Sequence, residues 1–328
     1  MPDSHMKLLA ILSDGKFHSG VDIGRQLNIS RSAVWKQLQK LIDLDLEIDS
    51  VKSKGYRLLG GFEPLDTSAI LAQSISTCST PLTLELFDSV ESTNTVAMER
   101  AVEGKCDELK GYVCLAERQS KGKGRRGRHW SSPYGRNIYL SLIWEFEGGA
   151  NKLEGLSLAV GMAVAESLNA IGLSAVKLKW PNDILVDGKK LGGILVEMAG
   201  DPAGLCQVVI GVGLNVHMQR GDDIEQPWAS IGHYLPEVSR NYLTAEIIRR
   251  LFTMLAIYEK EGFTALSSAW QQWDGFADAD VCVHSGASTI LGVAKGIYPN
   301  GALRLVVDGV DQAIYGGEVS LRLAQNDS

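Results

Sequence analysis

Residues 179–198 read KWPNDILVDGKKLGGILVEM and hold two apolar runs joined by a tight turn. The runs are Ile184–Val186 and Leu191–Met198, and the turn Val186-Asp187-Gly188-Lys189 contains an Asp-Gly pair, which favours a hairpin. Strands joined by so short a turn pair antiparallel, whereas the parallel strands of a Rossmann sheet need helical crossovers. The stretch therefore favours a mixed α+β sheet over a Rossmann fold.

Strands and helices predicted on either side extend this sheet into a large central domain. Helices are expected at Leu153–Ile171 and Leu243–Lys260, because apolar residues recur four apart in both. Further strands are predicted at Gly111–Ala116, Asn137–Phe146, Val176–Trp180 and Gln207–Leu214. Downstream, glycine turns separate short segments that predict a small β-barrel, namely Val281–His284, Thr289–Ile297, Ala302–Val307 and Glu318–Leu323.

The first 62 residues predict a winged helix-turn-helix. Three short helices are expected, at Leu8–Leu12, after Ser19-Gly20 and after Ser30, which is a good N-cap. The third helix has an apolar stripe at i, i+4 and i+7 that would face a core. Two predicted strands flank the basic tip Lys52-Ser53-Lys54-Gly55, which makes this hairpin the wing.

Polar and basic side chains of the third helix and the wing are the candidate DNA contacts. They carry the donors that base edges and phosphates need, and they are Arg31, Ser32, Trp35, Lys36, Gln39, Lys52 and Lys54. An indole such as that of Trp35 either touches a base or packs partly buried. The alternative for the whole segment is a small helical interaction domain whose charged face is merely solvated.

Composition excludes several classes of protein. The 328 residues are 45% hydrophobic and 22% charged with a net charge of −7, whereas residues 1–62 carry nine Lys/Arg against seven Asp/Glu. This balance disfavours general nucleic-acid binding but permits local DNA binding through one domain of a dimer. Because no apolar run approaches the roughly 20 residues of a membrane span and no signal peptide is recognisable, we expect a cytoplasmic location and no membrane partner. A disulfide framework or zinc site is disfavoured by five scattered cysteines without CxxC spacing, which are Cys78, Cys106, Cys114, Cys206 and Cys282.

The strongest local signal for chemistry is the loop at residues 117–130, ERQSKGKGRRGRHW. Six Lys/Arg and three glycines follow a predicted buried strand. Glycine permits close backbone approach and Arg offers planar forks for phosphate or carboxylate, so the loop predicts an ordered anion site. It lacks the Walker A pattern. The alternative is a disordered nucleic-acid tether.

Three further segments offer polar side chains beside predicted elements. Ser92-Thr93-Asn94 precedes a helix and suits small polar groups, although a plain N-cap explains it as well. Lys179-Trp180-Pro181-Asn182-Asp183 ends a strand in a stiff turn. Lys190 is followed by Gly192-Gly193, which indicates that something approaches the backbone there.

Together, five segments resemble the biotin–protein ligases, in the order in which that family carries them. They are Ser92-Thr93-Asn94, GKGRRGRHW at 122–130, KWPND at 179–183, KLGGIL at 190–195 and GVGLN at 211–215. With the winged helix, the chain resembles the bifunctional biotin ligase and biotin-operon repressor of bacteria over nearly its whole length. One departure is Lys123, where the family loop commonly has arginine, so charge is kept and bidentate geometry is lost.

The resemblance implies an activity, its substrates and its partners. ATP and biotin would give biotinyl-5′-AMP, which a lysine of the biotin carboxyl carrier protein of acetyl-CoA carboxylase then attacks. Mg²⁺ is expected with ATP, and no protein ligand for it is identifiable. The adenylate would promote a homodimer that represses the biotin operon at its operator DNA. The implied domains are a DNA-binding domain at 1–62, a catalytic domain at 63–273 and an SH3-like barrel at 274–328.

Residue roles follow from the same resemblance. Biotin would meet Ser92, Thr93, Asn94, Gln119, Lys123, Gly124, Arg125 and Lys190. The nucleotide would meet Arg125, Arg126, Arg128, Trp130, Lys179, Asn182 and Asn215. Catalysis would rest on Lys190, Arg125 and Asp183, the last either orienting or deprotonating the incoming lysine, or only stabilising its turn.

Two other classes remain as alternatives. A non-enzymatic repressor that senses a small acidic ligand explains the winged helix but not so many site segments. A lipoate or octanoyl transferase shares the broad fold, but an octanoyl transferase needs a cysteine nucleophile, and none of the five cysteines falls in the motifs.

Overall fold

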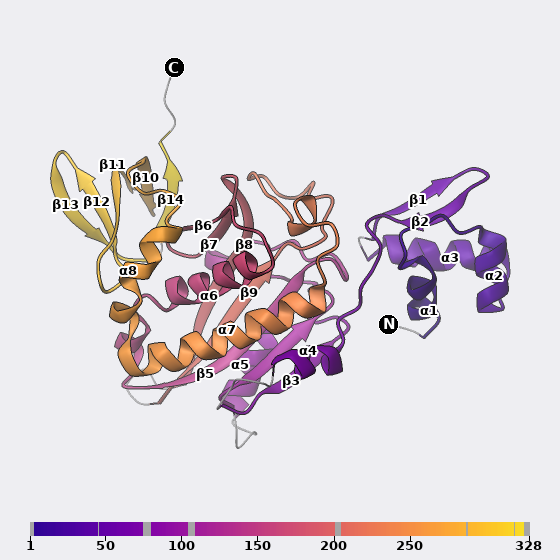
Figure 1. Ribbon diagram of the computed structural model, residues 1–328, viewed down its shortest axis with the longest axis horizontal. Coiled ribbons are helices and arrows are strands. Elements are labelled where there is room, and N and C mark those ends of the chain that lie inside the picture. Colours follow the sequence, from indigo (N-terminus) through magenta and orange to yellow (C-terminus); the bar gives the residue numbers. More distant parts are fainter. Residues whose placement is uncertain are drawn as a thin grey trace.

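The computed structural model describes residues 3–44, 46–74, 80–103, 109–200, 205–286, 288–317 and 319–324. Figure 1 shows a helical unit at one end, a large sheet with its helices in the middle and a small sheet at the other end. Cys78, Cys106 and Glu318 lie outside the described residues. No described helix combines the length and the apolar character that crossing a bilayer requires.

The N-terminal unit has the helix-turn-helix and wing that its sequence predicts. Its helices are α1 (Asp3–Leu12), α2 (Gly20–Leu27) and α3 (Arg31–Ile42), and its strands β1 (Ile48–Val51) and β2 (Gly55–Leu58) pair antiparallel. The hydroxyl oxygens of Ser19 and Ser30 cap α2 and α3 by accepting from the backbone N–H groups of Asp22 and Ala33. The i, i+4, i+7 stripe of α3 is buried, as its periodicity predicts.

The linker that follows β2, residues 59–62, contacts side chains of the central unit. Gly60 and Gly61 adopt positive φ angles of 72° and 67°. The Arg136 guanidinium donates to the carbonyl oxygens of Leu59 and Gly61 at 2.6 and 2.7 Å. The Phe62 ring stacks on the Tyr134 ring with centroids 6.1 Å apart. These contacts fix the linker backbone to the central sheet.

The central unit is a seven-stranded mixed sheet in the order β3-β4-β5-β9-β8-β7-β6. Among the strands that the structure describes in this sheet, β3 and β4 pair parallel and the other neighbours pair antiparallel. The strands are β3 (Thr83–Phe87), β4 (Tyr112–Ala116), β5 (Ile138–Glu147), β6 (Val176–Lys179), β7 (Asp183–Val186), β8 (Lys189–Gly200) and β9 (Leu205–Leu214). The predicted hairpin is confirmed, because β7 and β8 pair around a turn in which Asp187 and Gly188 have φ of 49° and 71°.

Helices cover both faces of this sheet (Figure 1). The major core lies between one face and a layer of α4 (Thr67–Ser74), α6 (Leu156–Ala170), α7 (Arg240–Glu261) and the short α8 (Ser267–Trp270). On the other face, α5 (Thr93–Glu103) packs over β4, β5 and β9 in a second cluster. Helix α6 begins three residues later than predicted, because residues 150–153 form a 3-10 turn and Gly155 precedes the helix with φ of 74°.

The C-terminal unit is a five-stranded antiparallel sheet in the order β13-β12-β11-β10-β14. Its strands are β10 (Asp280–Ser285), β11 (Ser288–Ile297), β12 (Leu303–Val307), β13 (Val310–Ile314) and β14 (Val319–Leu323). Strand β13 was not predicted, since its polar residues lack an alternating apolar pattern. The Trp180 indole N–H donates to the carbonyl of Gly301 at 3.0 Å, which joins this sheet to the end of β6.

Candidate active site

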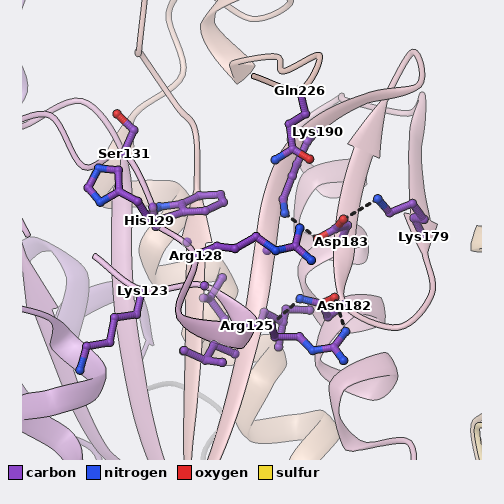
Figure 2. Close-up of a pocket in the computed structure, with 18 of the residues that line it drawn as sticks. Lys123, Arg125, Arg128, His129, Ser131, Lys179, Asn182, Asp183, Lys190 and Gln226 are labelled. Carbon is purple, nitrogen blue, oxygen red and sulfur yellow. Dashed lines mark hydrogen bonds and ion pairs between the residues drawn. The ribbon is translucent and has the colours of Figure 1, made fainter. Parts of the chain in front are cut away.

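One large cleft, of about 960 Å³, opens at the edge where β7 and β8 meet the glycine-arginine loop. Its walls come from the start of α5, the loop at 123–131, the 179–183 turn, β8, β9, the 223–227 loop and β14. Figure 2 shows side chains from the loop and from the β7–β8 region converging on this space. Segments that are far apart in the sequence therefore form one site.

The glycine-arginine loop is folded onto itself. The Gly124 N–H donates to the carbonyl of Arg128 at 2.7 Å, and the Trp130 N–H donates to the carbonyl of Gly122 at 3.0 Å. A 3-10 turn at Arg125–Gly127 closes the tip, where Arg126 and Gly127 have φ of 61° and 69°. The loop is therefore folded and is not an unstructured tether, and its binding of an anion stays a prediction.

Asp183 lies at the charged centre of the cleft and is 8% exposed. Its two carboxylate oxygens each contact one ammonium at 2.7 Å, that of Lys190 and that of Lys179 (Figure 2). Burial raises the pKa of the Asp183 carboxyl, but the two lysines outweigh burial and hold this pKa below its ordinary value. Asp183 is thus a poor base. Its two ion pairs hold the ammonium groups of Lys179 and Lys190 in place beside the cleft.

Arg125 spans the central and C-terminal units. Its guanidinium donates to Asn182 Oδ1 at 3.0 Å, to the carbonyl of Gly316 at 2.5 Å and to the carbonyl of Gly317. In Figure 2 Arg128 extends toward Asp183 and Lys190, whereas Lys123 points away from them. Lys123 Nζ instead donates to Thr95 Oγ1 at 3.3 Å.

The other end of the cleft is lined mainly by neutral polar groups. Ser92, Thr93 and Asn94 are buried there at the start of α5. The Thr93 N–H donates to Gln119 Oε1 at 2.9 Å, and Gln119 Nε2 donates to Ser132 Oγ at 3.1 Å. This wall offers several fixed hydrogen-bonding groups to a small neutral ligand.

The Trp130 indole lies against two glycines of β8 and β9. A Cβ on Gly213 would stand 2.8 Å from the ring, and one on Gly193 would stand 3.6 Å from it. The Lys190 ammonium is 5.6 Å from the ring centroid. The indole N–H has no hydrogen-bond partner in the described part of the chain. Gly213 therefore makes room for the ring that borders the charged centre, whereas a Cβ on Gly193 would make an ordinary van der Waals contact with it.

Most of the residues predicted for the site line this cleft. Two do not: Arg126 is exposed at the loop tip, and Asn215 is buried, donating from Nδ2 to the carbonyl of Ala229 at 3.0 Å. Sequence reasoning missed Ser141 and Glu197, which contact Asn94, although each is a polar residue inside an apolar strand. It also missed Ser320 and Arg322 of β14, which line the cleft and which no sequence pattern connected with it.

Most of the predicted DNA contacts are exposed. Arg31, Ser32, Trp35 and Lys36 are exposed on α3, as are Lys52 and Lys54 on the wing, and Gln39 is half-buried. Trp35 is 53% exposed, so its indole is not a core residue. An exposed tryptophan among basic residues is available to a partner.

Comparison with known proteins matches two segments of the chain to family models. Residues 86–215 match the Biotin/lipoate A/B protein ligase family, and residues 5–57 match the HTH domain. The chain is 38% identical over 322 residues to the bifunctional ligase/repressor BirA of Escherichia coli (strain K12). The aligned residues make up 98% of this chain and 98% of that one. The chain belongs to the BirA family of bifunctional ligase/repressors.

Two further comparisons agree with membership in the BirA family. Identity to the bifunctional ligase/repressor BirA of Bacillus spizizenii is 31% over 314 residues, or 93% of this chain and 94% of that one. The structure is similar to that of the biotin protein ligase from Aquifex aeolicus in complex with biotin and ATP, with a TM-score of 0.64, 26% identity and coverage of 74% and 99%. The chain is thus a ligase with an N-terminal helix-turn-helix domain, as the resemblance in its motifs predicted.

Two cysteines bear on the alternative that the chain is an octanoyl transferase. Cys114 is fully buried in β4, where burial raises the pKa of its thiol to about 12, and Cys206 is buried in β9. A protonated, inaccessible thiol is a poor nucleophile. Neither of these two cysteines fits the role that an octanoyl transferase needs.

Proposed function

We propose that the chain uses ATP to join biotin to a lysine of the biotin carboxyl carrier protein of acetyl-CoA carboxylase. The observation that carries the proposal is one cleft with a neutral polar end at Thr93 and Gln119 and a cationic end at Lys190, Lys179 and Arg128. Biotin has the same division, with a neutral ureido ring and a carboxylate. ATP brings further negative charge to the cationic end.

In the first reaction, a biotin carboxylate oxygen attacks the α-phosphorus of ATP and pyrophosphate leaves. Both substrates are anionic, so the step needs cations that offset their repulsion and the charge that gathers on phosphate oxygens. Lys190 and Lys179 are preorganised for this by Asp183, and Arg125 and Arg128 stand on the facing loop. Trp130 would border the adenine, and Lys123 and Gly124 would flank the biotin chain.

In the second reaction, a carrier lysine amine attacks the acyl carbon of biotinyl-5′-AMP and AMP leaves. The amine must lose a proton, and Asp183 is a weak base for it because two lysines lower its pKa. We therefore assign Asp183 the orienting role. Mg²⁺ would enter with ATP and neutralise the triphosphate, and we assign it no protein ligand.

We also propose that the chain represses the biotin operon. Its helix-turn-helix would bind operator DNA through α3 and the wing, and biotinyl-5′-AMP would act as co-repressor by promoting a homodimer. A domain with only two net positive charges binds DNA weakly on its own, whereas two linked domains on a palindromic site gain effective concentration. ATP, carrier and operator all imply a cytoplasmic location.

The proposed division into domains follows the elements. Residues 1–62 would be the DNA-binding domain, 63–273 the catalytic domain and 274–328 the C-terminal domain. The five-stranded C-terminal sheet supports an SH3-like barrel, since β11 is irregular between Ala294 and Ile297, where a strand of a small barrel has to bend.

Incubation with biotin, ATP and Mg²⁺ tests the ligase proposal. Mass spectrometry of the bound species should find biotinyl-5′-AMP, and adding a carrier domain should convert it into one biotinylated lysine with release of AMP. A parallel reaction without ATP is the control. A folded protein that forms neither product does not have this function.

A further inference from the structure

A second cavity, of about 290 Å³, lies between the central unit and the C-terminal sheet. Its walls come from the start of α6, the 180–182 turn, β8 and residues 300–302 and 315–316. One water molecule needs only about 10–15 Å³ of such space, so the cavity can take a side chain. Most of the residues proposed for biotin and ATP line the larger cleft instead.

The inner end of the cavity meets the main cleft at a shared wall. Arg125 and Asn182 line both spaces. The Arg125 guanidinium donates to Asn182 Oδ1 at 3.0 Å, and Figure 2 shows these two side chains in contact. Because both partners of this hydrogen bond line both spaces, the bond closes the boundary between the cavity and the cleft.

The outer end of the cavity faces solvent. Tyr315 lines it and is 61% exposed, and Glu154 lines it and is also exposed. The Glu154 carboxylate therefore places a negative charge beside the opening. A positively charged group, such as a lysine ammonium, is attracted to a carboxylate in this position.

Between these ends the walls are mainly apolar. The apolar residues include Leu156, Leu158, Ile194 and Val196. Two polar groups in the walls are hydrogen bonded to the protein, since the Ser157 hydroxyl donates to the carbonyl of Pro181 at 3.1 Å and the Trp180 indole N–H donates to the carbonyl of Gly301 at 3.0 Å. Such walls suit the methylene stem of a lysine and disfavour a charged ammonium.

The second reaction needs a neutral amine and a path for it to the acyl carbon. Biotinyl-5′-AMP would fill the main cleft from Thr93 to Trp130, and Asp183 is a poor base. An amine that leaves water for apolar walls and approaches the Arg125 guanidinium loses its proton more readily, because burial and a like charge both lower the pKa of an ammonium. The cavity offers both the path and this environment.

We propose that this cavity is the entry route for the carrier lysine, and that Arg125 closes its inner end until the adenylate phosphate draws the guanidinium into the main cleft. The lysine ammonium gives one proton to solvent as it enters. The neutral amine then forms a C–N bond with the acyl carbon, the bond from that carbon to the phosphate oxygen breaks, and AMP and a second proton are released. The inference rests on the proposed function, since it takes biotinyl-5′-AMP and a carrier lysine as the reactants.

The test is Val196→Trp, which fills the cavity from β8 without touching the main cleft. Pyrophosphate release from ATP and biotin should stay at the wild-type rate, because the first reaction does not use the cavity. Transfer of bound biotinyl-5′-AMP to a carrier domain, followed in a single turnover, should slow by about 10²-fold, as expected when a reacting group is kept from its attacking position.

The matched control is Val310→Trp, which makes the same exchange on the C-terminal sheet. Val310 is 62% exposed at the start of β13 and lines neither the cavity nor the main cleft. Both reactions should proceed as in wild type. Glu154→Gln keeps the shape of the opening but removes its charge, so kcat/KM for the carrier should fall and the difference from wild type should shrink at high salt.

The outcomes separate the two proposals. Wild-type protein that makes no adenylate, or transfers none to the carrier, overturns the proposed function and this inference with it. Where wild type performs both reactions, a Val196→Trp variant that transfers biotin at the wild-type rate, or that slows both reactions equally, overturns the inference alone. If Val196→Trp does not fold in thermal unfolding, Ser157→Trp fills the cavity from α6 and decides by the same two rates.

Discussion

Among single residues, the buried charge of Asp183 shapes the cleft most strongly. A buried carboxylate normally costs free energy, and here two ammonium groups at 2.7 Å compensate for it. The same ion pairs hold the ammonium group of each lysine in one position. Removing a lysine therefore removes a positioned positive charge from the site while Asp183 keeps its other partner.

Lys190→Ala should reduce adenylate synthesis by about 10²–10³-fold, the loss typical of one preorganised group that stabilises developing charge. The fold should survive, because Lys179 still pairs with Asp183. Pyrophosphate release from ATP and biotin measures the effect. Lys189→Ala, in the same turn but exposed, is the control and should be active. Normal pyrophosphate release by Lys190→Ala would refute the role of Lys190.

Arg125→Gly should still make biotinyl-5′-AMP but release it early. One guanidinium contact to a phosphate contributes about 1.5–3 kcal/mol, which corresponds to roughly ten- to hundredfold faster escape. A free acyl adenylate reacts with any exposed lysine, so bystander proteins in the mixture should become biotinylated. Bystander labelling at the wild-type level would show that Arg125 does not retain the adenylate.

Among elements, β8 and β9 carry the site because their glycines admit side chains from elsewhere. Gly211 admits the Asn94 amide, and Gly213 admits the Trp130 ring. Within the 190–195 motif, Gly192 has a steric cause, because a Cβ there would stand 2.8 Å from the carbonyl oxygen of Gly213.

Gly213→Ala should displace the Trp130 ring, since the new Cβ would stand 2.8 Å from it. Overpacking of this kind costs about 1–3 kcal/mol, so the KM for ATP should rise roughly tenfold if Trp130 borders the adenine. Steady-state kinetics with each substrate varied in turn measures this. A raised KM for biotin with an unchanged KM for ATP would contradict the assignment of Trp130.

Local patterns were sufficient to predict the β7–β8 hairpin, the stripe of α3 and the mixed sheet. They failed where a contact depends on two distant segments. The carbonyls of Gly316 and Gly317 reach Arg125 only because the C-terminal sheet docks beside the loop, and backbone acceptors leave no mark in a sequence. Ser141 can be noticed in the sequence as a hydroxyl residue within an apolar strand. Its contact with Asn94 is known only from the way α5 packs on β5.

At the scale of the whole molecule, the linker joins the two activities. The Arg136 side chain is almost fully buried, and burial lowers the pKa of its guanidinium to about 10. Its hydrogen bonds to the carbonyls of Leu59 and Gly61 satisfy that buried charge. The winged helix thus helps to stabilise the central sheet to which it is attached.

A chain of residues 63–328 should keep ligase activity and lose operator binding. It should also unfold at a lower temperature, because Arg136 loses two carbonyl acceptors and Tyr134 loses the Phe62 ring. Adenylate formation, a gel-shift assay and thermal unfolding measure the three effects. A truncated chain that folds but makes no adenylate would show that the winged helix belongs to the active site.

The fixed linker has a consequence for which DNA sites the chain can regulate. If two copies pair through their central units, as the proposed homodimer would allow, the distance between their α3 helices would be set by that pairing, since the backbone at 59–62 is bound to Arg136 and to the carbonyl of Ser13. Paired recognition helices fit half-sites at one separation along the duplex. Inserting flexible residues between Gly60 and Gly61 should therefore let the protein bind operators with added or removed base pairs between the half-sites. The intact linker would restrict regulation to a single spacing in the genome.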